Sequence, residues 1–163
     1  MFKEYSISAF QPGADKPDII AGLHLDVRLW QRESGQNEFA GRILDSQADL
    51  KAIEAYYIKP GGNFFIAKDN KGNVIGFIGL KNDGHGEGSL KRLAVVPEWQ
   101  RRGVGRALVS MAMDWAKRAG FARLSLQTHS REYAKPLYEK FGFKVTAWLE
   151  ERGDWIMECK LEA

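Results

Sequence analysis

The spacing of hydrophobic residues divides the amino-terminal part of the chain into a strand and two helices. Residues 2–10 alternate apolar and polar positions, which is typical of a half-buried strand. Residues 19–30 place apolar side chains three and four positions apart, which predicts a helix capped by Asp18. A second helix is expected over residues 46–57, because Ser46 and Asp49 have the spacing of a capping box.

The rest of the chain reads as strands interrupted by two helices. The expected strands are 64–68, 74–80, 89–96, 123–128, 144–149 and 155–161, and the expected helices are 102–119 and 133–141. The strand, helix and strand between residues 89 and 128 imply a right-handed parallel unit inside a mixed sheet. We therefore predict an α/β fold, with a central mixed β-sheet and helices on both faces, as a single domain over residues 1–163.

Length and composition are those of a globular protein. The chain has 163 residues, of which 44% are hydrophobic and 28% are charged. It lacks an apolar run of about 18 residues, and its first ten residues lack the pattern of a signal peptide. The single cysteine, Cys159, cannot form an internal disulfide. We expect a cytoplasmic location and no membrane partner.

The loop between the strand at 89–96 and the long helix carries the clearest chemical signal. Gly103 and Gly105 allow the backbone to approach a ligand closely. The amides at the start of the helix lack internal partners and carry partial positive charge, which favours phosphate. The loop also contains three arginines: Arg101, Arg102 and Arg106. The loop lacks the order of a P-loop or of a dinucleotide site.

The glycines and the basic residues of the loop also have simpler interpretations. The two glycines of the loop could form only a turn, and the net charge of +3 fits an ordinary solvated surface. Nucleic acid is not expected as a partner, because the basic residues gather at one helix start rather than along a stripe with aromatics. No cysteine and histidine set has zinc spacing, so no metal is expected.

Two motifs resemble those of one known family. The pattern Gln100-x-x-Gly103-x-Gly105, which follows LKRLAVVPEW, resembles the acyl-CoA signature of the GNAT family of N-acetyltransferases. Residues 134–143 are similar to the A-x-x-L-Y-x-x-x-G-F block of the same family. The blocks lie in the family's order and cover the central third of the chain closely. The resemblance implies the GNAT acyl-CoA N-acyltransferase fold, with acetyl-CoA as co-substrate.

The resemblance also implies roles for individual residues. The strand backbone at Leu93, Ala94 and Val95 would pair with the pantetheine arm. Amides of the loop would hold the pyrophosphate, and they belong to Arg101, Arg102, Gly103, Val104, Gly105 and Arg106. Tyr138 matches the family's tyrosine that protonates the leaving thiolate. Arg131 stands where many relatives have an asparagine that contacts the cofactor, and it would make that contact through charge.

The general base is the least defined part of the site. Many relatives have a glutamate at the position of Ser89, and Glu87 would share its face on a regular strand, so Glu87 is the candidate base. Some relatives carry a glutamate near the end of the next strand, where residues 126–128 have no carboxylate. His129 is interpreted as a histidine of a surface turn, with a contact to substrate as the alternative.

The resemblance predicts transfer of an acetyl group from acetyl-CoA to a primary amine by direct attack on the thioester. The alternative is a non-enzymatic acyl-CoA sensor or interaction module on the same fold. The acceptor would be a small-molecule or peptide amine, whose identity the sequence leaves open. Edge strands near 144–161 could pair two copies into a homodimer.

Overall fold

A seven-stranded β-sheet forms the frame of the part of the chain that the structure describes. The structure is a computed structural model and describes residues 4–35, 47–129 and 134–162. The strands are β1 (Tyr5–Ala9), β2 (Asn63–Asp69), β3 (Val74–Gly84), β4 (Glu87–Val95), β5 (Arg123–His129), β6 (Lys144–Leu149) and β7 (Asp154–Lys160). Their order across the sheet is β1-β2-β3-β4-β5-β7-β6.

One pair of neighbouring strands differs from the others in direction. β4 and β5 are parallel, and the remaining neighbours are antiparallel. The parallel pair needs a crossover connection, which the helix between β4 and β5 supplies. The fold therefore contains the parallel unit that the sequence pattern predicts.

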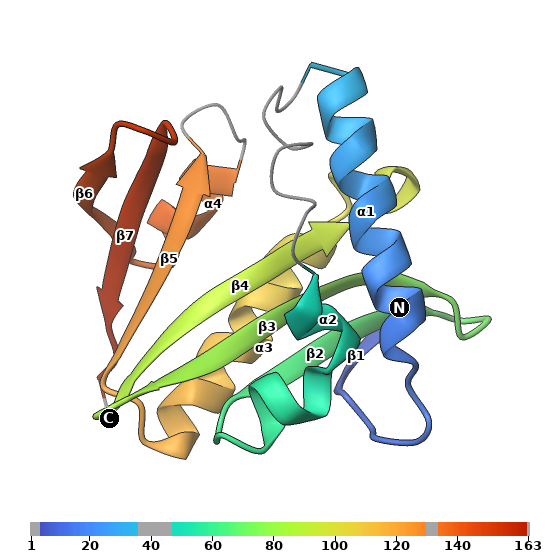
Figure 1. Cartoon of the computed structure of the whole chain (residues 1–163), viewed down its shortest axis with the longest axis horizontal. Helices are drawn as coiled ribbons and strands as arrows, with labels where there is room; N and C mark the ends of the chain where they lie inside the picture. Colours follow the sequence, from blue (N-terminus) through green and yellow to red (C-terminus); the bar gives the residue numbers. More distant parts are fainter. Residues whose placement is uncertain (1–3, 36–46, 130–133, 163) are drawn as a thin grey trace.

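Helices cover both faces of the sheet (Figure 1). The helical elements are α1 (Pro17–Glu33), α2 (Ala48–Lys51), the π-helical turn η2 (Glu54–Ile58), the 3-10 turn η3 (Pro97–Trp99), α3 (Val104–Ala119) and α4 (Ala134–Lys140). α3 lies behind the sheet in this view, and α1 and α2 lie in front of it. The predicted fold class, a mixed sheet with helices on both faces, is confirmed.

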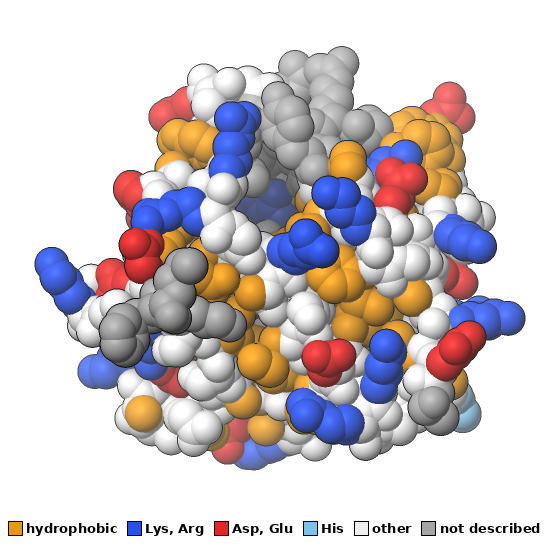
Figure 2. Space-filling model, turned by 180° about the vertical axis from the view of Figure 1, so that it is seen from behind, with side chains coloured by type: hydrophobic (Ala, Val, Ile, Leu, Met, Phe, Trp, Pro, Cys, Tyr) orange, Lys and Arg blue, Asp and Glu red, His pale blue; other side chains and the backbone are white. Residues whose placement is uncertain are grey.

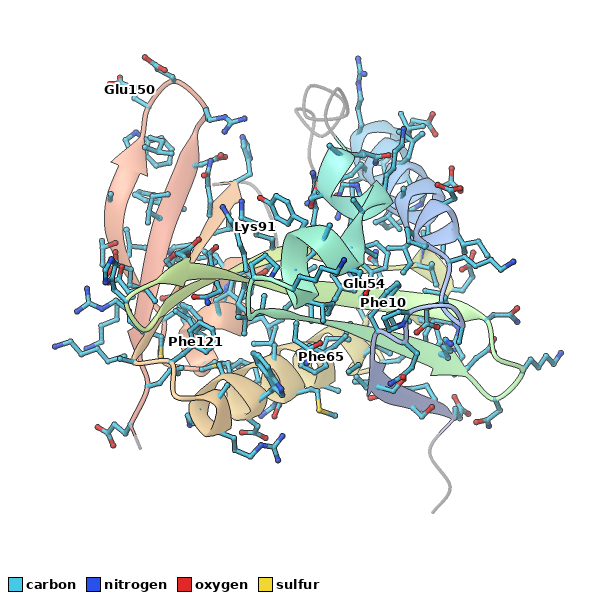
Figure 3. The ribbon with its side chains drawn as sticks, turned by 60° about the horizontal axis from the view of Figure 1, so that its bottom comes forward. Phe10, Glu54, Phe65, Lys91, Phe121 and Glu150 are labelled. Atoms are coloured by element: carbon cyan, nitrogen blue, oxygen red, sulfur yellow. The ribbon has the colours of Figure 1, made fainter. Side chains whose placement is uncertain are left out.

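Each face of the sheet has its own hydrophobic core, because side chains alternate along a strand. Phe65 belongs to the core beneath α3, whereas its neighbour Phe64 belongs to the core beneath α1 and η2. Figure 3 shows Phe65 and Phe121 on the α3 side and Phe10 on the other side. Burial of these aromatic side chains stabilises both layers, at about 2 kcal/mol for each.

Two local predictions about helix starts are wrong. The residue before α1 is Lys16 and Pro17 opens the helix, so Asp18 lies in the first turn rather than at the cap. The second predicted helix is instead divided into α2 and η2. Ser46 lies outside the described residues. Asp49 uses its carboxylate for tertiary contacts, described below, rather than for a capping box.

Among the described residues, no helix has the length and apolar character that crossing a membrane requires.

Candidate functional site

The site begins where β4 and β5 part. Parallel pairing joins Glu87–Ser89 to Arg123–Ser125 at the start of the two strands. Beyond these residues β4 continues along β3, and β5 continues along β7. The two strands therefore diverge, as their arrows show in Figure 1. A cleft of about 1160 Å³ lies between them, and residues of β4, β5, β7, α1, α3 and α4 line it.

A bulge in β4 lies beside this opening. The register of β4 against β3 pairs Lys91 with Gly79 but Ala94 with Phe77, so β4 carries one extra residue. Arg92 lies in the bulge with φ of 65°, in the left-handed region that non-glycine residues rarely adopt. Surrounding contacts must hold a residue in this conformation.

An ion pair with α2 provides such a contact. Arg92 donates from Nε to Oδ2 of Asp49 at 3.0 Å and from Nη2 to Oδ1 at 2.8 Å. The hydroxyl of Tyr57 donates to the same Oδ2 at 2.7 Å. Burial alone would raise the pKa of Asp49, but the hydrogen bonds from Arg92 and Tyr57 outweigh it and hold that pKa below its ordinary value. Asp49 is therefore a buried carboxylate that stays charged.

A glycine on β3 makes room for the tyrosine of this group. A Cβ at Gly79 would lie 2.6 Å from Cε1 of Tyr57, so a larger residue would push the ring away. The ring therefore lies against the strand, where its hydroxyl reaches Asp49. Burial and the bond to Asp49 raise the pKa of Tyr57 far above its ordinary value.

A buried histidine extends the polar group onto α1. The side chain of Arg28 donates from Nε to Nε2 of His24 at 3.4 Å, and Nδ1 of His24 lies 3.1 Å from the side-chain nitrogen Nε2 of Gln47. Burial, then the charges of Arg28 and Arg92, lower the pKa of His24 to about 3. His24 is therefore neutral at physiological pH and acts as a hydrogen-bonding part of the core.

The loop before α3 has the geometry that its sequence predicts. The side chain of Gln100 donates to the Val95 carbonyl at 3.0 Å and closes the loop onto β4. Gly103 precedes the helix with φ of 86°, in the region that favours glycine. Its carbonyl accepts from the Ala107 amide, so the amides of the residues between them lie ahead of the helical ladder. Those amides can bind an anion.

The residues assigned to this loop divide into two groups. Arg101, Gly103, Gly105 and Arg106 line the cleft, as do Leu93, Ala94 and Val95 of β4. Figure 2 shows Lys and Arg side chains gathered around a hollow on the α3 side of the molecule. Arg102 and Val104 lie outside the lining: Arg102 stacks 4.1 Å over the Trp99 ring and pairs with Glu4, and Val104 is buried in the core.

Tyr138 lies on the opposite side of the cleft from β4. It belongs to α4, is 7% exposed and lines the cleft. Its ring meets Phe143 edge-on with 6.0 Å between centroids. Pro136 occupies the first turn of the described helix, where a missing amide hydrogen does no harm. The structure therefore brings Tyr138 together with the loop and β4 around one cleft.

One other predicted site residue is not brought to this cleft. Glu87 is exposed at the start of β4, opposite Gly84 and Arg123, and it is not among the residues that line the cleft. It lies where β4 and β5 are still paired, so we do not carry its role as the base forward. Arg131 lies outside the described residues.

Sequence analysis missed a polar group on β5 and β7. His129 is 7% exposed and lines the cleft at the end of β5, so its interpretation as a surface turn residue is wrong. Asp154 of β7 lies directly opposite it and accepts a hydrogen bond from Nε2 of Gln127 at 2.5 Å. The sheet thus places a carboxylate of β7 beside the end of β5. This position of Asp154 follows from the pairing of β5 with β7, which the sequence alone does not reveal.

Comparison with known proteins identifies the family. The model of the acetyltransferase (GNAT) family matches residues 26–143 of the chain. The match covers more than half of the chain and includes the loop, β4, β5 and α4. The chain belongs to the GNAT family, as the two sequence motifs predict.

Individual relatives agree with this assignment. The chain is 31% identical to N-acetyltransferase family 8 member 2 of Rattus norvegicus over 106 residues, which are 61% of this chain and 46% of that protein. The chain spans about half the length of such curated relatives.

Solved structures share the fold. A GNAT acetyltransferase from Staphylococcus aureus Mu50 matches with a TM-score of 0.81 and 22% identity, over 97% of this chain and 99% of that one. The PaiA N-acetyltransferase of Thermoplasma acidophilum, solved in complex with coenzyme A, matches with a TM-score of 0.74 and 22% identity, over 95% and 99%.

Proposed function

We propose that the protein is an N-acetyltransferase that moves the acetyl group of acetyl-CoA to a primary amine. The observation that carries this proposal is the parting of β4 and β5 beside the start of α3. It creates an open strand edge and an anion-binding helix start around one cleft. A long acyl carrier with a diphosphate at one end and amides along its arm suits this combination.

The cofactor would lie along the cleft from the loop to the opposite face of the sheet. The amides from Arg101 to Arg106 would bind the pyrophosphate, with the side chains of Arg101 and Arg106 adding charge. The backbone at Leu93, Ala94 and Val95 would bind the pantetheine arm as an added strand would. Arg102 and Val104 would contribute backbone amides only, because their side chains lie elsewhere.

The chemistry would be direct attack on the thioester. The neutral amine forms a bond to the carbonyl carbon, and a backbone amide of residues 93–95 stabilises the oxyanion. Collapse of the intermediate breaks the carbon–sulfur bond, and the Tyr138 hydroxyl gives its proton to the thiolate. Holding both reactants in one cleft supplies much of the acceleration.

The acceptor would enter from the face of the sheet that carries α1 and α2. Arg28, Asp49 and Tyr56 line the cleft on this side. Lys91 points from β4 to the same side, away from α3 (Figure 3). The polar lining suits a small-molecule or peptide amine.

An amine panel tests the proposal. Purified protein is incubated with acetyl-CoA and spermidine, an aminoglycoside, aspartate or a short peptide with a free amino terminus, and released CoA is measured with a thiol reagent. We expect one class of amine to accelerate CoA release and to become acetylated. A protein that binds acetyl-CoA but shows no release with any primary amine is instead a sensor or interaction module.

A further inference from the structure

We propose that His129, supported by Asp154, is the base that accepts the proton of the acceptor amine. This inference rests on the proposed acetyl transfer and adds a catalytic residue to it. The sequence motifs leave the base undefined, and Glu87 lies outside the cleft. His129 combines burial, a place in the cleft and an imidazole, a side chain that can serve as a general base.

The two faces of the parted sheet separate the base from the acid. Leu124 and Leu126 of β5 belong to the core beneath α3, so Gln127 and His129 occupy the opposite face. Tyr138 packs into the α3-side core. A thioester in the gap would therefore have Tyr138 on one side of the sheet and His129 on the other. An amine entering from the α1 side would meet His129, and the thiolate would remain near Tyr138.

Asp154 lies on the same face of the sheet as the histidine. In the antiparallel pairing of β5 with β7, His129 lies opposite Asp154, and opposite side chains share a face at about 5 Å between Cβ atoms. Asp154 is 8% exposed, and Gln127 fixes its Oδ2 by a hydrogen bond of 2.5 Å. A carboxylate on the same face favours, through its charge, the imidazolium that proton transfer creates. Asp154 is a positioning residue in this arrangement.

The proton balance of the step is complete. His129 takes one proton from the ammonium group, and the resulting amine forms the carbon–nitrogen bond. A second proton leaves the nitrogen to solvent as the carbon–sulfur bond breaks, and the thiolate takes a proton from Tyr138, which solvent then protonates again. After His129 and Tyr138 return to their starting states, the products are the amide, the free thiol and one proton released to solvent.

Other charged and titratable groups face the same cleft and enter any pH profile. They come from the turn before β7, from α4, β3, β4, α1, α2 and η2, and from the loop and start of α3, and they are Arg152, Tyr138, Lys140, Asp83, Lys91, Arg92, Arg28, Asp49, Tyr56, Arg101 and Arg106. Arg92 and Asp49 neutralise each other. Among the described residues of the lining, His129 is the histidine.

The test compares pH profiles of variants on the best amine from the panel. In His129→Gln we expect kcat/KM at neutral pH to fall about 100-fold or more, and the rise in activity with pH that the imidazole causes to disappear. Calorimetric affinity for acetyl-CoA should stay unchanged. In His129→Ala, added imidazole should restore part of kcat, which a merely structural role would not allow.

A matched pair of β7 variants tests the supporting carboxylate. Asp154→Asn should lower kcat while acetyl-CoA affinity stays constant. Glu158→Gln makes the same change on the same face, outside the cleft lining, and should leave kcat unchanged. Wild-type pH dependence in His129→Gln, or no imidazole rescue of His129→Ala, overturns the role of His129 but leaves acetyl transfer standing. A wild-type protein that acetylates no amine refutes both.

Discussion

Asp49 on α2 and Arg92 on β4 form a two-pronged ion pair that ties the bulge of β4 to the helical layer. Arg92 has an unfavourable backbone conformation, with φ of 65°. It lies in the part of β4 that no longer pairs with β5. The pair therefore holds the strand edge in the shape that opens the cleft. Tyr57 completes this contact through its hydroxyl.

Removing one partner of this pair should destabilise the fold. Asp49→Asn leaves the Arg92 charge buried without its carboxylate, and we expect the free energy of unfolding to fall by roughly 3 kcal/mol. Chemical denaturation measures this. Asp83→Asn is the control, because Asp83 makes a half-exposed pair with Lys81 at 4.0 Å and should cost less than about 1 kcal/mol. Equal effects of the two substitutions would contradict the role given to the buried pair.

The buried histidine predicts a specific pH dependence of stability. The folded pKa of His24 is about 3, below its value of 6.5 in an unfolded chain. Between these values the unfolded state binds a proton that the folded state does not. The stabilisation that neutral His24 contributes is therefore complete above about pH 6.5. It is lost as pH falls, by up to about 1.4 kcal/mol of unfolding free energy for each pH unit.

Denaturation between pH 6.5 and 5 isolates this effect, because carboxylates titrate mainly at lower pH. His24→Gln should flatten the dependence over this interval, since Gln does not ionise. An equally steep loss of stability in the variant would show that another group causes it.

The proposed binding of the diphosphate by the loop before α3 predicts that Gly103→Asp loses cofactor binding. A carboxylate near a bound diphosphate costs about 4 kcal/mol at close range, so we expect affinity for CoA to fall roughly 100- to 1000-fold. Gly120→Ala is the matched control, because Gly120 also has positive φ, at the other end of α3. It should cost about 1 kcal/mol of stability and keep CoA affinity. Calorimetry showing unchanged affinity in Gly103→Asp would refute the loop assignment.

The proposed role of Tyr138 as the acid predicts that Tyr138→Phe lowers turnover without weakening cofactor binding. The ring and its packing against Phe143 remain, but the proton donor is lost. We expect kcat to fall about 100-fold while the dissociation constant of CoA changes little. Tyr5→Phe removes a hydroxyl from an aromatic residue of β1 that packs on Trp99, outside the cleft, and serves as the control. Unchanged turnover in Tyr138→Phe would remove the tyrosine from the mechanism.

Local patterns predicted most of the elements and the loop that borders the cleft. The loop from Gln100 to Arg106 is contiguous, so its glycines and arginines can be read from the chain. The block around Tyr138 is equally local. Alternation of apolar residues or short apolar runs bounded by turns were sufficient for the strands and for the fold class, because most strands are buried on at least one face, with the exposed edge strand β6 as an exception.

Contacts between distant segments could not be predicted in this way. Asp49 and Arg92 are 43 residues apart, and Gln127 and Asp154 are 27 residues apart. Asp49 has the spacing of a capping residue, and nothing near it in the chain indicates that Arg92 binds its carboxylate. His129 follows the expected strand of residues 123–128, whereas the structure makes it the last residue of β5, buried and opposite Asp154.

A crystal structure with acetyl-CoA tests the central claim most directly. The account predicts the diphosphate on the amides of residues 101–106, the pantetheine arm along residues 93–95 of β4, and the sulfur near Tyr138. A complex with the cofactor bound elsewhere, or with β4 and β5 paired along their whole length, would contradict it.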